Sequence, residues 1–285
     1  MTATIHTTAP TRLLPLLNPL AAVTDLWRHR DLIRQFTRRE IEGRYKGSYL
    51  GLLWSFITPL VMLLVFTFVF GVVFKARWPH ARGGDSLAEF ALVMFAGQLA
   101  FQAFAEPVNR AAGLIVGVPN FVKKVVFPLQ ILPVAVVGAG LYHVGVGLLI
   151  ALGASLLIHG SVPWTALLVP LSLLPLALLG LGVSWFLASL GVYVRDIGYM
   201  VGVVMQALFF ATPILYPVTA IPEPYRAWMA LNPLTPMVGL VRDHLIIGNV
   251  GEPAVWGMGF AYGVVALGLG YAWFMVTRKG FADVL

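Results

Sequence analysis

Long uncharged runs separated by short polar stretches set the pattern of this chain. Four segments contain no Asp, Glu, Lys or Arg, and they cover residues 49–74, 125–194, 197–222 and 253–277. A helix needs roughly 20 apolar residues to cross the hydrocarbon core of a bilayer. Each run is therefore long enough for a membrane-spanning helix, and the 70-residue run from 125 to 194 is long enough for two.

The polar and turn-forming residues between these runs divide the chain into six predicted spans. The 70-residue run divides at His159-Gly-Ser-Val-Pro163, which is a turn signal. A polar loop from Lys75 to Asp85 separates the first span from the second. The predicted spans cover about residues 50–74, 87–110, 129–158, 163–193, 198–211 and 253–276. The fold class predicted is an all-α polytopic membrane protein, with residues 48–285 forming its transmembrane domain.

The segment before the first span has a different pattern. Residues 1–23 read as an irregular lead-in, whereas residues 24–47 predict an amphipathic helix. At 100° per residue, Leu26, Ile33 and Phe36 fall on one half of this helix, and Arg34 and Arg38 fall on the other. Such a helix lies in the membrane interface with its cations toward anionic headgroups. A solvated cytoplasmic helix is the alternative.

A proline-rich segment, residues 212–250, breaks the pattern between the fifth and sixth spans. It is too apolar for an ordinary loop and too interrupted for a span. Short re-entrant helices near the outer surface fit this composition, because irregular backbone at membrane depth needs shielding by protein or a water-filled cavity.

Composition and charge set the orientation. The chain is 59% hydrophobic, only 11% charged, and carries a net charge of +7. With the N-terminus placed inside, 14 of the 19 Lys and Arg residues fall on the cytoplasmic side. This bias predicts that both ends are cytoplasmic. The basic residues lie beside the spans, as on a membrane surface, so nucleic acid is not a predicted partner.

Several kinds of chemistry are absent from the sequence. There is no cysteine, no phosphate-binding G-x-x-x-x-G-K-[ST] motif, and no His pair with metal-ligand spacing. Ser184 and His143 are the only tempting pair for an intramembrane hydrolase, and they read first as a packing serine and a buried imidazole. We therefore predict no catalytic residue and no metal site.

Residues at membrane depth are the better lead to function. Glu106 and Arg110 lie one helical turn apart and could pair, and Arg242 in the broken outer segment could line an exit. Dense aromatic residues could let sugar rings slide by stacking. The candidate lining residues are Trp54, Phe66, Phe70, Glu106, Arg110, Phe209, Tyr216 and Arg242.

Five short runs, in this order, carry a resemblance to a known family. They are RREIEGRYKGSYLGLLW at 38–54 followed by Thr58-Pro59, PNFVKKVVFP at 119–128, YVRDIG at 193–198, TPILYP at 212–217 and NPLTP at 232–236. Over about residues 25–280 the chain resembles the membrane (permease) subunits of ABC transporters that export polysaccharides. It is most similar to O-antigen exporters, with teichoic-acid and capsule exporters of the same family as alternatives.

The resemblance implies a homodimer in the inner membrane with two cytoplasmic ABC ATPase subunits, which bind ATP and magnesium, so that this chain holds no cofactor itself. It implies a polysaccharide on a polyprenyl diphosphate lipid as substrate. The residues it implies for coupling to the ATPase are Val118, Asn120, Phe121, Lys123 and Lys124. Those implied for attraction of the lipid diphosphate are Arg34, Arg38, Arg39 and Arg44. An ion-coupled carrier and an intramembrane enzyme of lipid-linked sugars stay open as other classes.

Overall fold

The computed structural model describes residues 19–75, 78, 86–123 and 127–285, and within these ranges the chain is helical and contains no strand. Five helical segments are long and apolar enough to cross a membrane: Gly51–Val73, Leu87–Ala111, Ile131–His159, Trp164–Tyr193 and Pro253–Val284. A sixth apolar helix, Ile197–Ala211, has 15 residues. Most of the predicted lead-in lies outside the described residues.

The helices begin and end close to the predicted spans. The first segment is composite, with η1 (Gly51–Leu53), α4 (Trp54–Phe66) and the π-helical η2 (Thr67–Val73), and α5 (Leu87–Ala111) and α7 (Ile131–His159) follow. The next are η3 (Trp164–Leu168) with α8 (Val169–Tyr193), then α9 (Ile197–Ala211). The last is α12 (Pro253–Thr277), continued by η6 (Arg278–Gly280) and α13 (Phe281–Val284). Apolar run length therefore located these helix ends to within two residues.

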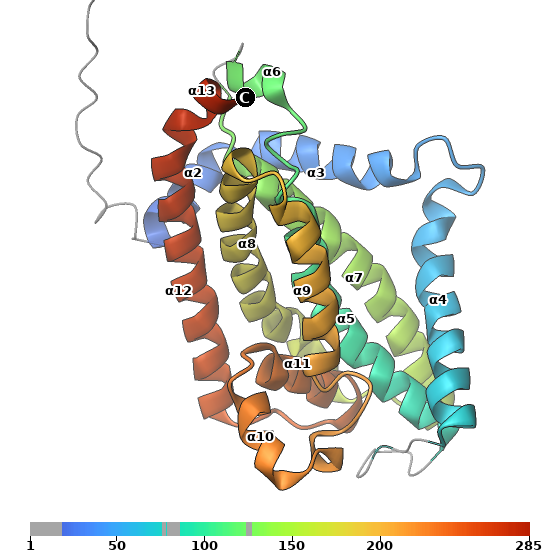
Figure 1. Ribbon diagram of the computed structural model, residues 1–285. Helices are drawn as coiled ribbons and strands as arrows, with labels where there is room; N and C mark the ends of the chain where they lie inside the picture. The colour runs from blue at the N-terminus through green and yellow to red at the C-terminus, as the bar shows by residue number, and fades with distance from the viewer. Residues whose placement is uncertain (1–18, 76–77, 79–85, 124–126) are drawn as a thin grey trace, which may run out of the picture.

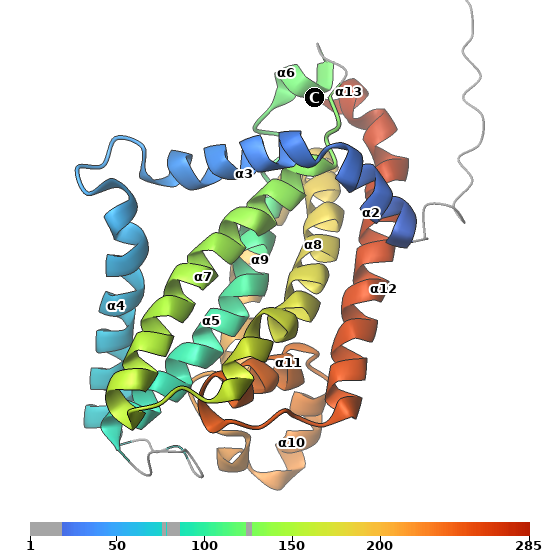
Figure 2. The same ribbon diagram turned by 180° about the vertical axis from the view of Figure 1, so that it is seen from behind.

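The N-terminal segment forms two helices, α2 (Pro19–Arg28) and α3 (Arg30–Tyr45), where the sequence predicted one helix over 24–47. The break falls at His29, whose backbone N–H donates to Leu26 O in a tight last turn. The His29 ring Nδ1 also lies 2.9 Å from the carbonyl of Asp25, so the side chain caps the end of α2. Helix α2 is thereby freed to follow a direction different from that of α3 (Figure 2).

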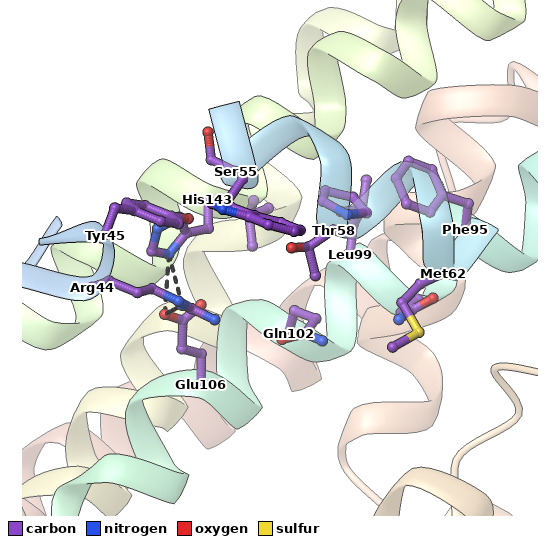
Figure 3. Close-up of a pocket in the computed structure, with 14 residues that line it drawn as sticks. Arg44, Tyr45, Ser55, Thr58, Met62, Phe95, Leu99, Gln102, Glu106 and His143 are labelled. Carbon is purple, nitrogen blue, oxygen red and sulfur yellow. Dashed lines mark hydrogen bonds and ion pairs between the residues drawn. The ribbon is translucent and has the colours of Figure 1, made fainter. Parts of the chain in front are cut away.

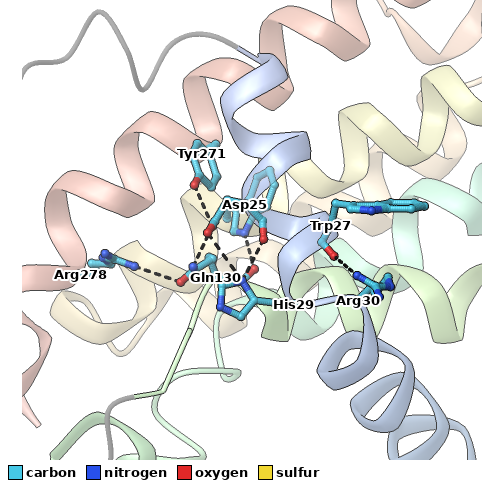
Figure 4. A network of polar contacts seen from close by, with 8 residues as sticks. Asp25, Trp27, His29, Arg30, Gln130, Tyr271 and Arg278 are labelled. Carbon is cyan, nitrogen blue, oxygen red and sulfur yellow. Dashed lines mark hydrogen bonds and ion pairs between the residues drawn. The ribbon is translucent and has the colours of Figure 1, made fainter.

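A polar network holds α2 against the bundle (Figure 4). The Oδ2 atom of Asp25 accepts hydrogen bonds from Gln130 Nε2 at 2.8 Å and from the Tyr271 hydroxyl at 3.0 Å. Arg278 Nη1 donates to Gln130 Oε1 at 3.0 Å. These contacts join α2 to the start of α7 and to the end of α12, segments far apart in sequence.

Helix α5 lies at the centre of the bundle, whereas α4 stands apart from it (Figure 1). In the most apolar window of each, 78% of α5 is buried but only 6% of the Gly51–Val73 segment. Helices α8 and α12 approach until their backbones touch, because a Cβ atom on Gly270 would lie 2.0 Å from the carbonyl oxygen of Gly182. Small residues allow such close packing in membranes.

The broken segment 212–250 forms η4 (Val218–Ala220), α10 (Glu223–Ala230), α11 (Leu234–Arg242) and the π-helical η5 (Asp243–Ile247). Figure 1 shows α10 and α11 at one end of the bundle, and α2, α3, α6 (Pro119–Lys123) and α13 at the other. Helix α11 is not a surface element, because Leu234, Met237 and Val238 are almost fully buried. It packs against α5 and α8.

Candidate translocation path and cytoplasmic contact surface

A polar stripe runs along α5, the most buried of the long helices. Between Glu89 and Ala111 only five residues escape burial, and every one is polar: Gln98, Gln102, Glu106, Asn109 and Arg110. Their spacing of three or four places them on one face of the helix. A polar face on a membrane-spanning helix is strongly disfavoured against lipid and normally faces protein or water. The stripe therefore marks the side of the bundle where a polar path can run.

A cavity of about 140 Å³ opens beside this stripe, between the end of α3 and helices α4, α5 and α7 (Figure 3). A groove continues from it along α3 and α5, past Arg39, Glu40, Asn109 and Arg110. The cavity is lined by Arg44, Tyr45, Trp54, Ser55, Thr58, Pro59, Met62, Phe95, Gln98, Leu99, Gln102, Glu106, His143 and Val144.

Glu106 is the polar centre of the cavity. Its Oε1 atom accepts from Arg44 Nη1, and His143 Nδ1 lies 3.1 Å from the same oxygen. Since Arg44 belongs to α3 and His143 to α7, three helices meet at one carboxylate. Tyr45 packs edge-on to the His143 ring at 5.9 Å, and burial raises the pKa of the Tyr45 hydroxyl, which stays protonated at neutral pH.

The expected pairing of Glu106 with Arg110 is wrong. Arg110 Nη2 instead donates to Glu40 of α3, while Glu106 is taken by Arg44 and His143. Helical spacing allows an i, i+4 pair, but α3 crosses the end of α5 and offers each residue a partner of opposite charge. Two ion pairs thus tie α3 to α5.

The four α3 arginines have different surroundings. Arg38 donates to Glu42 at 2.6 Å on the exposed face, and Arg39 places its guanidinium 4.1 Å from the Phe36 ring centre. Arg34 is exposed. Arg44 turns inward to Glu106. Arg34, Arg38 and Arg39 thus present an outward basic surface, whereas Arg44 belongs to the cavity.

The short helix α6 lies at the same end of the molecule as α3. Phe121 stacks on Phe127 at 4.6 Å and meets Phe36 of α3 edge-on at 6.0 Å. Asn120 and Lys123 are exposed, and Val118 is half-buried. Phe121 is therefore a link between α6 and α3, while Asn120 and Lys123 form the open surface. Lys124 lies outside the described residues.

The aromatic candidates do not form a single lining within one protomer. Trp54 borders the cavity, but Phe66 and Phe70 pack side by side at 6.3 Å against the core. Phe209 packs edge-on to Phe101 at 5.4 Å. The Tyr216 hydroxyl donates to the carbonyl of Phe210. Of this set, Trp54 alone reaches the cavity beside α5.

Arg242 does not line an exit, because it is buried inside the bundle at the end that holds α11. Its guanidinium donates to the carbonyls of Val93, Pro213 and Ile214 at 3.1–3.2 Å and lies 4.2 Å from the Trp78 ring centre. These contacts join α5, the 212–215 turn and α11. Arg242 is a structural cross-link.

Sequence reasoning missed Gln98, Gln102 and His143 as cavity residues. The i, i+4, i+8 spacing of Gln98, Gln102 and Glu106 was a usable signal, because three polar residues share one face of an apolar helix. His143 had no such signal in the sequence, since only the fold brings it to Glu106.

The oxygen of Ser184 and the Nε2 atom of His143 are both buried without a hydrogen-bond partner among the described residues, so the two do not form a nucleophile and base pair. No cluster of three His, Asp or Glu that could hold a metal occurs in the described part of the chain.

A bundle with five helical segments long and apolar enough to cross a membrane is typical of a multi-pass membrane protein. The chain belongs to the ABC-2 type transporter family, whose pattern matches residues 31–246. It is 32% identical over 228 residues to the O-antigen export system permease protein RfbA of Myxococcus xanthus, covering 79% of this chain and 83% of that protein. It is 26% identical over 258 residues to the protein of the same name in Klebsiella pneumoniae (90% and 95% covered). It is 24% identical over 226 residues to the polysialic acid transport protein KpsM of Escherichia coli (75% and 81% covered). It is accordingly a multi-pass protein of the inner membrane.

Proposed function

We propose that this chain is the permease subunit of an exporter that moves a polyprenyl-diphosphate-linked polysaccharide of the O-antigen type across the inner membrane. The observation that carries the proposal is the polar stripe on α5. A long hydroxyl-rich polymer needs a polar surface through the bilayer, and α5 offers part of one, from Gln98 to Arg110, over about 18 Å of the half nearer to α3. The relatives with export permease names support the same substrate class.

The proposal includes six crossings with both ends inside. Helices α4, α5, α7, α8, α9 and α12 each run between the end that holds α3 and the end that holds α11 (Figure 1). A helix of 15 residues spans only about 22 Å, so α9 leaves the outer part of its crossing to the turn at residues 212–217. The 14-to-5 distribution of basic residues supports a cytoplasmic position for the α3 end.

A second copy would complete the path. On an isolated protomer the stripe on α5 is open on one side, and the apolar faces of α4 and α9 beside it are exposed: Leu64 is 69% and Val203 is 71% accessible. Two copies related by a two-fold axis would enclose the stripe and bury part of these faces. We propose the homodimer on this ground.

Because the chain has no phosphate-binding loop, the driving force would come from ATP hydrolysis, with magnesium, in a partner subunit. The exposed Asn120 and Lys123 of α6 would contact that ATPase. Phe121 would pass the movement to Phe36 of α3, and the Arg44–Glu106 pair would carry it to α5. A closure of the ATPase would thus bias the bundle between two arrangements.

The absence of native cysteine makes the path testable with single introduced thiols. Gln102→Cys and Asn109→Cys in the stripe should react with a water-soluble maleimide in intact membranes, because the reagent needs a hydrated thiolate. Leu64→Cys and Val203→Cys, which are exposed on apolar faces, should react at least about tenfold more slowly. Equal reaction rates at all four positions would contradict a polar path beside α5.

Coupling needs a separate experiment. Lys123→Glu should weaken copurification with the ATPase, because it reverses a charge on the open face of α6. Phe121→Ala should keep copurification but lower export per ATP hydrolysed, because it removes the contact with α3. Lys46→Glu, the same charge change on an exposed residue at the far end of α3, is the control. An active exporter that purifies without any ATPase would favour an ion-coupled carrier.

A further inference from the structure

Two polar atoms at the cavity beside α5 are buried without a partner. Gln98 Oε1 and His143 Nε2 have no hydrogen-bond partner among the described residues, although both side chains line the cavity. A buried polar atom left unpaired destabilises a fold, so such atoms at a cavity indicate a ligand that completes them.

Both orphan atoms are acceptors. Glu106 and Arg44 both lie within hydrogen-bond distance of His143 Nδ1, and the carboxylate can only accept. We assign the ring proton to Nδ1, toward the Glu106 oxygen at 3.1 Å, which makes the 3.2 Å approach of Arg44 to Nδ1 a contact without a hydrogen bond and leaves a lone pair on Nε2. The amide oxygen of Gln98 is an acceptor by its chemistry. A ligand that satisfies both must bring hydrogen-bond donors.

This requirement separates a sugar ring from a lipid diphosphate. A diphosphate diester at neutral pH presents acceptor oxygens, whereas a sugar ring presents hydroxyl donors. The cavity also lacks an uncompensated positive charge, since its one cation, Arg44, is held by Glu106. Its charge and hydrogen-bonding capacity therefore match a neutral polyol.

The size and one wall of the cavity fit the same ligand. A volume of about 140 Å³ is close to the ~150 Å³ cavity that accommodates benzene in an engineered protein, so the cavity is on the scale of one six-membered ring, and its opening leaves room for the ring substituents. Trp54 forms part of the wall, and its indole N–H is already donated to Ser48 Oγ at 2.9 Å. The electron-rich ring face remains for the C–H groups of a sugar.

We propose that this cavity is a binding subsite for a single neutral hexopyranose unit of the exported polysaccharide, with Gln98 and His143 accepting from its hydroxyl groups and Trp54 stacking on its ring. The subsite rests on the proposed function, because it lies on the polar path of α5. It assigns sugar recognition to the membrane chain itself.

The test uses the full chain in vesicles of phosphatidylethanolamine and phosphatidylglycerol, which contain no sugar. Thr58→Cys, an exposed cavity residue, reports access through its rate of maleimide reaction. For a Kd near 10 mM, a methyl hexopyranoside at about 50 mM should slow that rate about sixfold, following 1 + [L]/Kd. The probes are the methyl glycosides of glucose, mannose and galactose, with inorganic pyrophosphate as the anionic comparison.

Each outcome decides one point. Protection by at least one hexopyranoside and none by pyrophosphate supports the subsite. Protection by pyrophosphate alone, or by none of the probes, overturns it. Protection only by a glucosyl-diacylglycerol added to the vesicles makes the site a lipid-headgroup site and also overturns it. If neither Gln102→Cys nor Thr58→Cys reacts with the maleimide, no hydrated path runs beside α5, and the proposed function is contradicted as well.

A second variant separates recognition from structure. Gln98→Leu in the Thr58→Cys background replaces an unpaired amide with an apolar group of similar size, so resistance to unfolding in SDS should stay equal or rise. Hexopyranoside protection should fall at least about threefold. Gln206→Leu, the loss of an exposed amide on α9, is the matched control and should keep protection. Unchanged protection in Gln98→Leu, or a loss of stability together with protection, would contradict the assignment of Gln98.

Discussion

Arg242 allows the sharpest test of the packing at the end of the bundle that holds α11. The side chain is only 6% accessible, and three of its hydrogen bonds end on backbone carbonyls of two different segments. Arg226 makes the same type of bond, to the carbonyls of Ile221 and Thr219, but on the exposed surface of α10. The two arginines therefore differ mainly in burial.

The magnitude follows from the contacts. A hydrogen bond from a charged donor contributes about 1.5–3 kcal/mol, and a cation over an aromatic ring in a desolvated site about 2 kcal/mol. Desolvation of the guanidinium offsets part of this sum. We expect Arg242→Ala to lower the free energy of unfolding by about 3–5 kcal/mol, because it also leaves buried carbonyls unpaired. Arg226→Ala should lower it by less than about 1 kcal/mol, since water replaces the lost donors.

The assay is reversible unfolding of the purified chain in mixed micelles of increasing SDS fraction, followed by tryptophan fluorescence and circular dichroism. Arg242→Lys should recover less than half of the loss, because an ammonium group cannot contact three carbonyls and lie flat over Trp78 at once. If Arg242→Ala is no less stable than Arg226→Ala, the guanidinium does not cross-link α5 to the outer segment.

Three further predictions use the same assay. Gly270→Ala should destabilise the chain by about 3 kcal/mol, because the added Cβ would lie 2.0 Å from the backbone of α8. Gly257→Ala is the control, and it should be neutral or slightly stabilising because the space around Gly257 is open. Similar losses of stability in both variants would refute a backbone contact at Gly270. A double-mutant cycle on Arg44→Met and Glu106→Gln should give a coupling energy of about 1–3 kcal/mol. An exposed ion pair within α3 should give only ~0.5 kcal/mol. A coupling energy near zero would show that the Arg44–Glu106 ion pair does not hold α3 to α5. Asp25→Asn should lower stability by about 1–2 kcal/mol and expose α2 to protease, because a neutral amide oxygen is a weaker acceptor than the carboxylate for the bonds from Gln130 and Tyr271. Unchanged protease resistance would mean that the network in Figure 4 does not hold α2.

The apolar pattern predicted the long helices well for a physical reason. A helix in a bilayer must satisfy its backbone hydrogen bonds within itself, so its ends follow closely from where the apolar run ends. That rule located α5, α8 and α12 almost to the residue. The same rule does not predict where α2 ends, because the break at His29 arises from a hydrogen bond between its side chain and the carbonyl of Asp25, one turn earlier.

Pairing of charged residues was less predictable. Glu106 and Arg110 could form an i, i+4 pair on their own helix, yet both bond to α3, which the fold lays across them. Arg242 sat in a proline-broken segment that suggested an exit, but three carbonyls and Trp78 surround it inside the bundle. Local spacing shows which partners are available, and only the packing of distant helices decides among them.

By itself the sequence determined the all-helical class, the ends of the long apolar helices and the family resemblance, because hydrophobic run length and short motifs are local properties. The tertiary structure alone brought His143 to Glu106, turned Phe121 toward α3 and left only polar residues open on α5 between Glu89 and Ala111. These arrangements depend on helices 30 to 100 residues apart meeting at one place. A cavity has no sequence signal of its own, because it is the space that several packed helices leave between them.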